Sequence, residues 1–332
     1  MYFTQSLVVI DGGVYKSVSA CAGVALNQGE LFVRGATFSN NLLDFSSNAF
    51  GGVFGSLSLQ GVKAVVRDSI FQDNTGDCIG SSQCAGAAIS HYGGSLKLNK
   101  NLFVGNIVTD EGSGGAIGLF DVLLEADENV FRENESESYG GAVYSFIGQS
   151  IFFDNLFELN SIPAVIGLFQ GGGAIYSEGT ILILVSNIFK NNSQKGTDTI
   201  FGDGGGALLL RGFEGSISAS AYIEGNTFDS NVSEADGGAI DIDGLASVFL
   251  TCNQFKSNAA KNGEGGAVDI YRSDVTSKGN EYQMNTSRNR GGAIRLWLSQ
   301  MKSVEDVFNS NKFGTAVKHN MLHISIIYVS VL

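Results

Sequence analysis

Apolar and polar residues alternate along many short stretches of this chain. In residues 239–243 (AIDID), 95–99 (SLKLN) and 267–270 (AVDI), every second side chain is apolar. This alternation places one set of side chains inward and the other outward on a β-strand. No stretch shows the apolar spacing of three, four and seven residues that predicts a helix. The chain has 45 glycines and one proline, a composition that suits short strands joined by tight bends and disfavours long helices.

Two short signals repeat along the sequence. Gly-Gly-Ala followed by an aliphatic residue begins at Gly114, Gly140, Gly172, Gly205, Gly237, Gly265 and Gly291. An aromatic residue followed three positions later by asparagine occurs at Phe38, Phe71, Phe103, Phe131, Phe157, Phe189, Phe228, Phe255, Tyr282 and Phe308. A period of about 20–50 residues indicates a solenoid, propeller or array. Three strands of about five residues and three bends fill about 28 residues. We therefore predict an all-β fold, a single-stranded right-handed parallel β-helix of about ten coils with three short strands per coil.

Each repeated residue type has an expected role in such a helix, because equivalent residues stack about 4.8 Å apart on successive coils. The aliphatic and the aromatic residue of each repeat should form interior columns. The paired glycines should allow a sharp bend. The asparagines either form a ladder of side-chain amides or follow a simple turn preference. Glycosylation sequons occur at Asn134, Asn191, Asn231 and Asn285. Since the other three are repeat asparagines, Asn191 alone is expected to be accessible.

The combination of GGA[ILV] with FxxN resembles the passenger repeats of the polymorphic outer membrane proteins of chlamydiae, over roughly residues 20–318. Similar repeats occur in large surface or secreted β-helix proteins. The resemblance implies a pectin-lyase-like β-helix that is displayed outside the cell as an autotransporter-like passenger, often as an adhesin. It also implies an extracellular or cell-surface location, associated with the outer membrane if the source is a bacterium.

The predicted domain organisation is simple. Residues 1–318 form the β-helix, and residues 319–332 form an apolar C-terminal tail that is too short to span a bilayer. The N-terminal residues lack the positive charge and the long apolar run of a signal peptide. Since neither end resembles a cap, we expect the chain to be a fragment of a longer polypeptide, with the tail an artefact of truncation. A tail that closes the last coil as a strand is the alternative.

The charge and the cysteine content of the chain limit its expected binding partners, disulfides and metal sites. The formal net charge is −13 and no cluster of lysine and arginine occurs, so nucleic acid is not an expected partner. Cys78 and Cys84 flank five residues and could form a disulfide in an oxidising compartment, with buried free thiols as the alternative. The three histidines do not lie near a cysteine pair, which argues against a zinc site.

The position after each Gly-Gly-Ala-aliphatic signal is the candidate for chemistry. This position should point outward and form one column: Ser90, Gly118, Tyr144, Tyr176, Leu209, Asp241, Asp269 and Arg295. Asp241, Asp269 and Arg295 would then lie above one another, with Asp243 alongside. Carboxylates about 5 Å apart could bind calcium, for which Asp241 and Asp269 are the candidates, or could act as acid and base. An ordinary ion pair between coils is the alternative.

The function that we expect is interaction or structure without intrinsic catalysis. The chain would act in adhesion or as a stalk, with a glycan or protein on a host or neighbouring cell surface as partner. The alternative is a carbohydrate-active enzyme, a polysaccharide lyase, hydrolase or epimerase, that uses Asp241, Asp243, Asp269 and Arg295. The sequence motifs of polygalacturonases and polysaccharide lyases are absent as a set. No cofactor is expected, with calcium as the alternative, and exposed pairs such as Tyr144 and Tyr176 could contact sugar rings.

Overall fold

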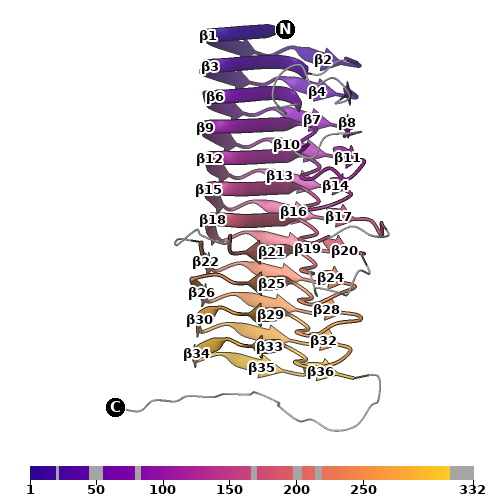
Figure 1. Cartoon of the computed structure of the whole chain (residues 1–332), viewed down its shortest axis with the longest axis vertical. Coiled ribbons are helices and arrows are strands. Elements are labelled where there is room, and N and C mark those ends of the chain that lie inside the picture. The colour runs from indigo at the N-terminus through magenta and orange to yellow at the C-terminus, as the bar shows by residue number, and fades with distance from the viewer. Residues whose placement is uncertain are drawn as a thin grey trace.

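The chain folds into a single elongated solenoid of stacked β-coils (Figure 1). The computed structural model describes residues 1–19, 22–44, 55–78, 84–165, 170–196, 204–213 and 219–314. Every strand pairing among these residues is parallel, and the strands form three sheets of 15, 11 and 10 strands. The predicted all-β parallel β-helix with three sheets is therefore confirmed. The 11-stranded sheet contributes one strand per coil, close to the ten coils predicted.

The first sheet has long strands in the N-terminal half of the solenoid. They are β1 (Tyr2–Asp11), β3 (Ala22–Arg34), β6 (Gly55–Arg67), β9 (Ile89–Asn99), β12 (Ile117–Asp127), β15 (Val143–Phe153) and β18 (Ile175–Val185). In the later coils two shorter strands replace each long one. These pairs are β21 (Leu208–Arg211) with β22 (Ser220–Glu224), β25 (Ile240–Asp243) with β26 (Ser247–Thr251), β29 (Val268–Tyr271) with β30 (Asp274–Lys278), and β33 (Ile294–Trp297) with β34 (Gln300–Val304).

The long strands are about twice the length expected from the sequence, because they continue through a corner. In β12 and β15 that corner lies at Asp121 and Ile147, whose backbone φ angles are 57° and 60°. The second half of each long strand packs its apolar residues inward against the same core as the first half. One continuous strand therefore covers two sides of the coil.

The second and third sheets consist of short strands. The second contains β2 (Val14–Lys16), β4 (Thr37–Ser39), β7 (Ile70–Gln72), β10 (Leu102–Val104), β13 (Val130–Arg132), β16 (Leu156–Glu158), β19 (Ile188–Lys190), β23 (Thr227–Asp229), β27 (Gln254–Lys256), β31 (Glu281–Gln283) and β35 (Val307–Asn309). The third contains β5 (Leu42–Asp44), β8 (Thr75–Asp77), β11 (Ile107–Thr109), β14 (Glu135–Ser136), β17 (Ser161–Ile162), β20 (Ser193–Gln194), β24 (Val232–Ser233), β28 (Ala259–Ala260), β32 (Thr286–Ser287) and β36 (Lys312–Phe313).

The aromatic residue of each repeat forms an interior column along the second sheet, as predicted. Consecutive rings from Tyr15 to Phe308 stack with centroids 4.7–4.9 Å apart. The aliphatic residues of the Gly-Gly-Ala signals also stack in register, for example Ile240 on Val268. Both columns belong to one continuous hydrophobic core. The first glycine of each pair has a positive φ, from 59° at Gly114 to 78° at Gly205, which provides the predicted bend.

The repeat asparagines form a ladder, and the alternative of a simple turn preference is wrong. The Asn160 Nδ2 atom donates to Asn192 Oδ1 at 3.0 Å and to the Phe131 carbonyl at 2.9 Å. The same pattern extends from Asn41 to Asn311. The sequon residues Asn134, Asn231 and Asn285 are buried in this ladder, whereas Asn191 is exposed.

A second asparagine ladder was not predicted. It consists of Asn101, Asn129, Asn155, Asn187, Asn226, Asn253 and Asn280, and ends on Asp306. Each of these residues lies two positions before a column aromatic residue, so the complete repeat signal is Asn-x-Phe-x-x-Asn. The two ladders flank the short strands of the second sheet. Their side chains form hydrogen bonds with the backbone polar groups of the bends on either side of it.

Candidate functional site

One column of the first sheet contains three of the four candidate residues. Asp241 pairs with Asp269, and Asp269 pairs with Arg295, in the register expected from the sequence. The expectation that this column faces solvent is wrong. Asp241 and Asp269 are 5% and 1% exposed, and Leu209 in the same column is fully buried. The predicted carboxylates therefore lie close together but are not accessible from the surface.

The segment that precedes each glycine pair covers the column. The Gly204 amide donates to Asp241 Oδ2 at 2.9 Å. At Gly118, a Cβ atom would lie only 2.4 Å from the Ala85 Cβ atom, because the covering segment approaches the strand so closely. Glycine at this position thus allows the close approach. The column faces away from the core but lies beneath a second layer of backbone.

Arg295 lies at the centre of a network of three carboxylates. Its guanidinium forms a bidentate pair with Asp269, with Nη2 at 2.9 Å from Oδ2, and Nη1 lies 2.9 Å from Glu264 Oε2. Its Nη2 atom also lies 3.4 Å from Asp236 Oδ2. The Arg295 side chain is 11% exposed and that of Asp269 2%. The guanidinium thus neutralises the surrounding carboxylates, a role that a bound cation would otherwise have to fill.

Burial is the main influence on the titration of Asp269. It raises the pKa of the Asp269 carboxyl to about 8, and the charges of Asp236 and Glu264 add to the rise, while Arg295 opposes it. The remaining candidate, Asp243, is separate from this network. It pairs with Arg272 at 2.9 Å and with Arg211 at 3.9 Å near the surface. The structure thus brings together Asp241, Asp269 and Arg295 but not Asp243.

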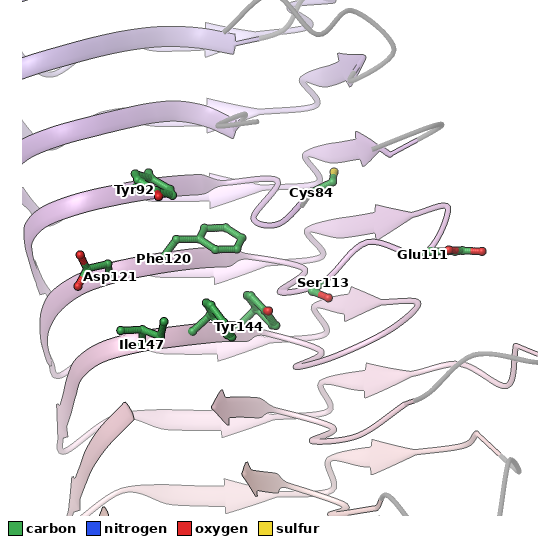
Figure 2. A pocket seen from close by; sticks show the side chains of 9 residues that line it. Cys84, Tyr92, Glu111, Ser113, Phe120, Asp121, Tyr144 and Ile147 are labelled. Atoms are coloured by element: carbon green, nitrogen blue, oxygen red, sulfur yellow. The ribbon is translucent and has the colours of Figure 1, made fainter. Parts of the chain in front are cut away.

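A pocket on the outer face of the first sheet was not predicted as a site. It has a volume of about 290 Å³ and lies over β9, β12 and β15 (Figure 2). The described residues that line it are Cys84, Tyr92, Glu111, Ser113, Phe120, Asp121, Tyr144, Phe146 and Ile147. Figure 2 shows Glu111 and Asp121 on opposite sides of the aromatic side chains.

The aromatic rings of the pocket do not stack as closely as those of the core. Tyr92 and Phe120 have centroids 6.2 Å apart at 25°, and Phe120 and Tyr144 have centroids 5.5 Å apart at 53°. Tyr144 stacks in turn on Tyr176 at 5.4 Å, so the expected tyrosine pair exists. Tyr176 is buried, however, and only 1% exposed. Burial, with a further contribution from Glu178, raises the pKa of the Tyr144 hydroxyl, which keeps it protonated.

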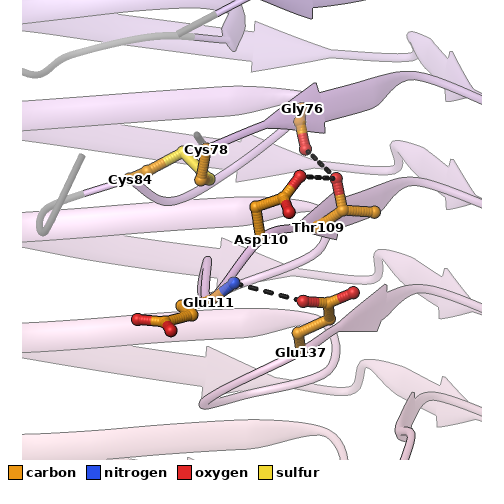
Figure 3. The surroundings of a disulfide bond; sticks show 7 residues. All are labelled: Gly76, Cys78, Cys84, Thr109, Asp110, Glu111 and Glu137. Atoms are coloured by element: carbon orange, nitrogen blue, oxygen red, sulfur yellow. Dashed lines mark hydrogen bonds between the residues drawn. A yellow bond between two sulfur atoms is a disulfide. The ribbon is translucent and has the colours of Figure 1, made fainter. Parts of the chain in front are cut away.

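A disulfide joins Cys78 and Cys84 beside the pocket (Figure 3). Both residues are buried in a small apolar cluster with Leu43, Ala87 and Val108. The backbone amide of the neighbouring Glu111 donates to Glu137 Oε2 at 3.2 Å. The disulfide and this hydrogen bond hold the bends that form one wall of the pocket. Of the other cysteines, Cys252 is free and exposed, and Cys21 lies outside the described residues.

The described residues contain neither a metal-binding cluster nor a membrane-spanning helix. No group of three or more His, Cys, Asp or Glu side chains there is arranged to hold a metal ion. No helix long and apolar enough to span a membrane occurs in the same part of the chain. The predicted apolar tail, residues 319–332, lies outside it.

Comparison with known proteins gives one weak structural similarity and no matching family or curated relative. No known protein family matches the sequence, and no curated protein is significantly similar to it. Among solved structures, the chain is weakly similar to a fragment of TibA, residues 55–350, that is hyperglycosylated by TibC. The sequence identity is 8%, the TM-score is 0.22, and the alignment covers 93% of this chain and 99% of that fragment. A similarity of this size supports no argument about function.

Proposed function

We propose that this chain is an interaction module of a cell-surface or secreted protein, which presents a fixed surface on a stiff solenoid and catalyses no reaction. The observation that carries the proposal is the closure of the only carboxylate–arginine column that the sequence offered for catalysis. Asp269 is 1% exposed and held by Arg295. A general acid or base must be within hydrogen-bond reach of a substrate, and the covering segment prevents this.

The remaining features of the molecule suit a role outside the cell. The Cys78–Cys84 disulfide is typical of proteins in oxidising compartments. The two asparagine ladders and the stacked aromatic column hold each coil to its neighbours along the whole described length. An adhesive module or a stalk needs this stiffness, because it must keep its binding surface at a fixed distance from its anchor.

The alternative, a carbohydrate-active enzyme on an acidic polysaccharide, has one observation in its favour. The raised pKa of Asp269 is a property that catalytic acids often share. Structural ion-pair networks shift pKa values as well, and Arg295 together with three carboxylates is such a network. Calcium binding by Asp241 and Asp269 belongs to the same alternative. Like catalysis, it would require these two buried carboxylates to become accessible.

Two assays on the purified chain test the proposal. Beads coated with the protein should be retained on cell surfaces or on immobilised glycans. The same protein should release no product from pectate or alginate, with or without calcium. Turnover that is lost in Asp241→Asn or Asp269→Asn would overturn the proposal and establish the enzyme. Turnover that survives both changes would also overturn it, and would exclude the predicted column as the site.

A further inference from the structure

We propose that the pocket over β9, β12 and β15 binds the alkylammonium group of a small organic cation. The inference rests on the proposed function, because it names a ligand class for an interaction module. The pocket differs from the rest of the solenoid surface in three ways. Its described lining has two carboxylates and no basic side chain, its aromatic rings spread apart, and a β-branched residue with a positive φ lies at its corner.

The charge of the pocket favours a cation. Two exposed carboxylates, those of Glu111 and Asp121, line it, and no lysine or arginine is among its described lining residues. Elsewhere on the surface, carboxylates are commonly paired with basic residues of the next coil, as Glu125 is with Lys97 at 2.6 Å. Both carboxylates would repel an anionic ligand, whereas a cation at the aromatic rings would be attracted, chiefly by Asp121, which follows Phe120 in the chain.

The aromatic residues provide the second component of a cation site. A cation is attracted to the face of an aromatic ring when it lies within about 6 Å of the centroid. The exposed pair Tyr222 and Phe249 stacks at 4.9 Å and 8°, which leaves no space between the rings. Tyr92, Phe120 and Tyr144 instead spread apart, with centroid distances of 6.2 Å and 5.5 Å and tilts of 25° and 53°. Tyr92 and Phe120 therefore leave part of their ring faces uncovered by the neighbouring ring.

The backbone of the corner supports a role for the side chains of Asp121 and Ile147. Each corner residue of this column has a positive φ; it is glycine in some coils, such as Gly93 and Gly179, and carries a side chain in others, such as Gln28 and Arg272. Asp121 and Ile147 keep side chains there, at φ 57° and 60°. Isoleucine is the only β-branched residue among the described non-glycine residues with positive φ, and this conformation is unfavourable for it. Both side chains line the pocket.

The size of the pocket indicates a small group. Its volume of about 290 Å³ is at the lower limit of ligand sites, which are about 300–1,000 Å³. A tetramethylammonium or choline headgroup fits this space, and aromatic cages are a common means of binding such ions. The disulfide at Cys84 and the hydrogen bond from Glu111 to Glu137 hold one wall in place before any ligand binds.

A ligand titration followed by NMR tests the inference. We expect tetramethylammonium and choline to bind saturably at low salt, and the neutral isostere 3,3-dimethylbutanol and methyl glucoside to bind at least tenfold more weakly. Tyr92→Ala should weaken choline binding about five- to tenfold. Asp121→Asn, which keeps the left-handed backbone accessible, should weaken it about three- to tenfold, an effect that added salt removes. The affinities for choline and for N-trimethyl-lysine are then compared. The tighter of the two shows whether the alkylammonium group comes from a lipid headgroup or from a methylated lysine side chain.

The chain offers a matched control for each variant. Tyr222→Ala removes an exposed, stacked tyrosine outside the pocket, and Asp154→Asn changes an exposed aspartate with φ 53° at another corner. Both should bind choline like the wild type. Ile147→Gly should reduce binding while the midpoint of thermal unfolding stays the same or rises, because glycine relieves the backbone.

Two results would overturn the inference. One is equal affinity for choline and its neutral isostere. The other is cation affinity that Tyr92→Ala and Asp121→Asn leave unchanged. In either case, bead adhesion without polysaccharide turnover would leave the proposed interaction function intact. Polysaccharide turnover would overturn that function whatever the cation titration shows.

Discussion

At the scale of single residues, the ladder asparagines satisfy backbone groups that the bends leave unpaired. Asn160 is fully buried. Its Oδ1 atom accepts from the Asn134 amide at 3.1 Å and from Asn134 Nδ2 at 3.0 Å. Its Nδ2 atom donates to the Phe131 carbonyl at 2.9 Å. The same Nδ2 atom also donates to Asn192 Oδ1 in the next coil, so one side chain joins three coils, and removing it leaves several buried polar groups without partners at once.

We predict that Asn160→Ala lowers the free energy of unfolding by about 3–5 kcal/mol, since each buried polar group left unpaired costs about 1–3 kcal/mol. The matched control is Asn191→Gly, at an exposed ladder-adjacent position with φ 54° that glycine tolerates. Its effect should stay within about 0.5 kcal/mol. Denaturant unfolding of both variants measures the difference. Equal stability of the two variants would contradict the role assigned to the ladder.

His91 is a second residue whose burial has a measurable consequence. Its ring lies in the core in register with Leu59 and Leu119, and its Nε2 atom donates to the Val62 carbonyl at 3.1 Å. Desolvation by burial lowers the pKa of His91 to about 4. The folded state therefore binds the imidazole proton more weakly than the unfolded state does, whose ordinary pKa is about 6.5. The stabilisation is present above pH 6.5 and is lost as the pH falls toward 4.

We predict that His91→Leu removes this pH dependence. The wild type should lose about 3 kcal/mol of the free energy of unfolding to His91 protonation as the pH falls through this range. The variant should be stabilised relative to the wild type at pH 4, and by less at pH 7. The difference between the two proteins at each pH isolates His91 from the carboxylates, which titrate in both. A difference that does not change with pH would contradict the assigned cause.

At the scale of strands and bends, the sequence was sufficient for the pairing and register but not for the layer above the first sheet. The spacing of Gly-Gly-Ala and Phe-x-x-Asn placed Asp241, Asp269 and Arg295 in one column, as the register shows. Their burial depends on how closely the covering segment returns to the strand, a property of the bend that no periodicity encodes. Leu209, which lies between Tyr176 and Asp241 in the same column, was the available signal, because an outward-facing leucine suggests a covered face.

The pocket could not have been predicted from the repeat for a related reason. It requires the bends at Cys84 and Ser113 to lie opposite the corner at Asp121 and Ile147. Four residues after the aliphatic position, Gly61, Gly93 and Gly179 give way to Asp121 and Ile147 in the two intervening coils. Side chains also occupy this position at Gln28, Arg272 and Leu298. An alignment of the repeats would therefore not distinguish the coils that form the pocket.

The disulfide permits a prediction at the same scale. Cys78 and Cys84 are six residues apart, and closing a loop of this length stabilises a fold by about 2 kcal/mol in the chain-entropy account. We expect Cys78→Ala with Cys84→Ala to increase amide hydrogen exchange at residues 84–90 and to weaken choline binding. A reducing agent should reproduce both effects in the wild type and add nothing in the double variant. Cys252→Ala is the control, since that thiol is free and exposed.

At the scale of the whole molecule, each coil contacts only its neighbours, so stability is close to a sum over coils and interfaces. The parallel register repeats after 28 residues from Asn106 to Asn134 and after 27 residues from Asn258 to Asn285. Removal of one such unit joins equivalent positions. Deletion of residues 107–134 would connect Asn106 to Glu135, and deletion of 259–285 would connect Asn258 to Thr286, in each case replacing a residue by its in-register partner.

We predict that both deletions give folded, shorter solenoids, because every remaining coil keeps an aromatic residue and ladder asparagines to stack on. Circular dichroism should show the same β signal per residue as the wild type. The deletions should differ in binding. Removing residues 107–134 takes away Glu111, Phe120 and Asp121, the floor and both carboxylates of the pocket, and should abolish choline binding. Removing residues 259–285 brings Arg295 onto Asp241, the residue in register with the deleted Asp269, and should leave choline binding unchanged. If both shortened chains bound choline alike, the ligand would have to occupy some other part of the solenoid, whereas misfolding of both would contradict the independence of the coils.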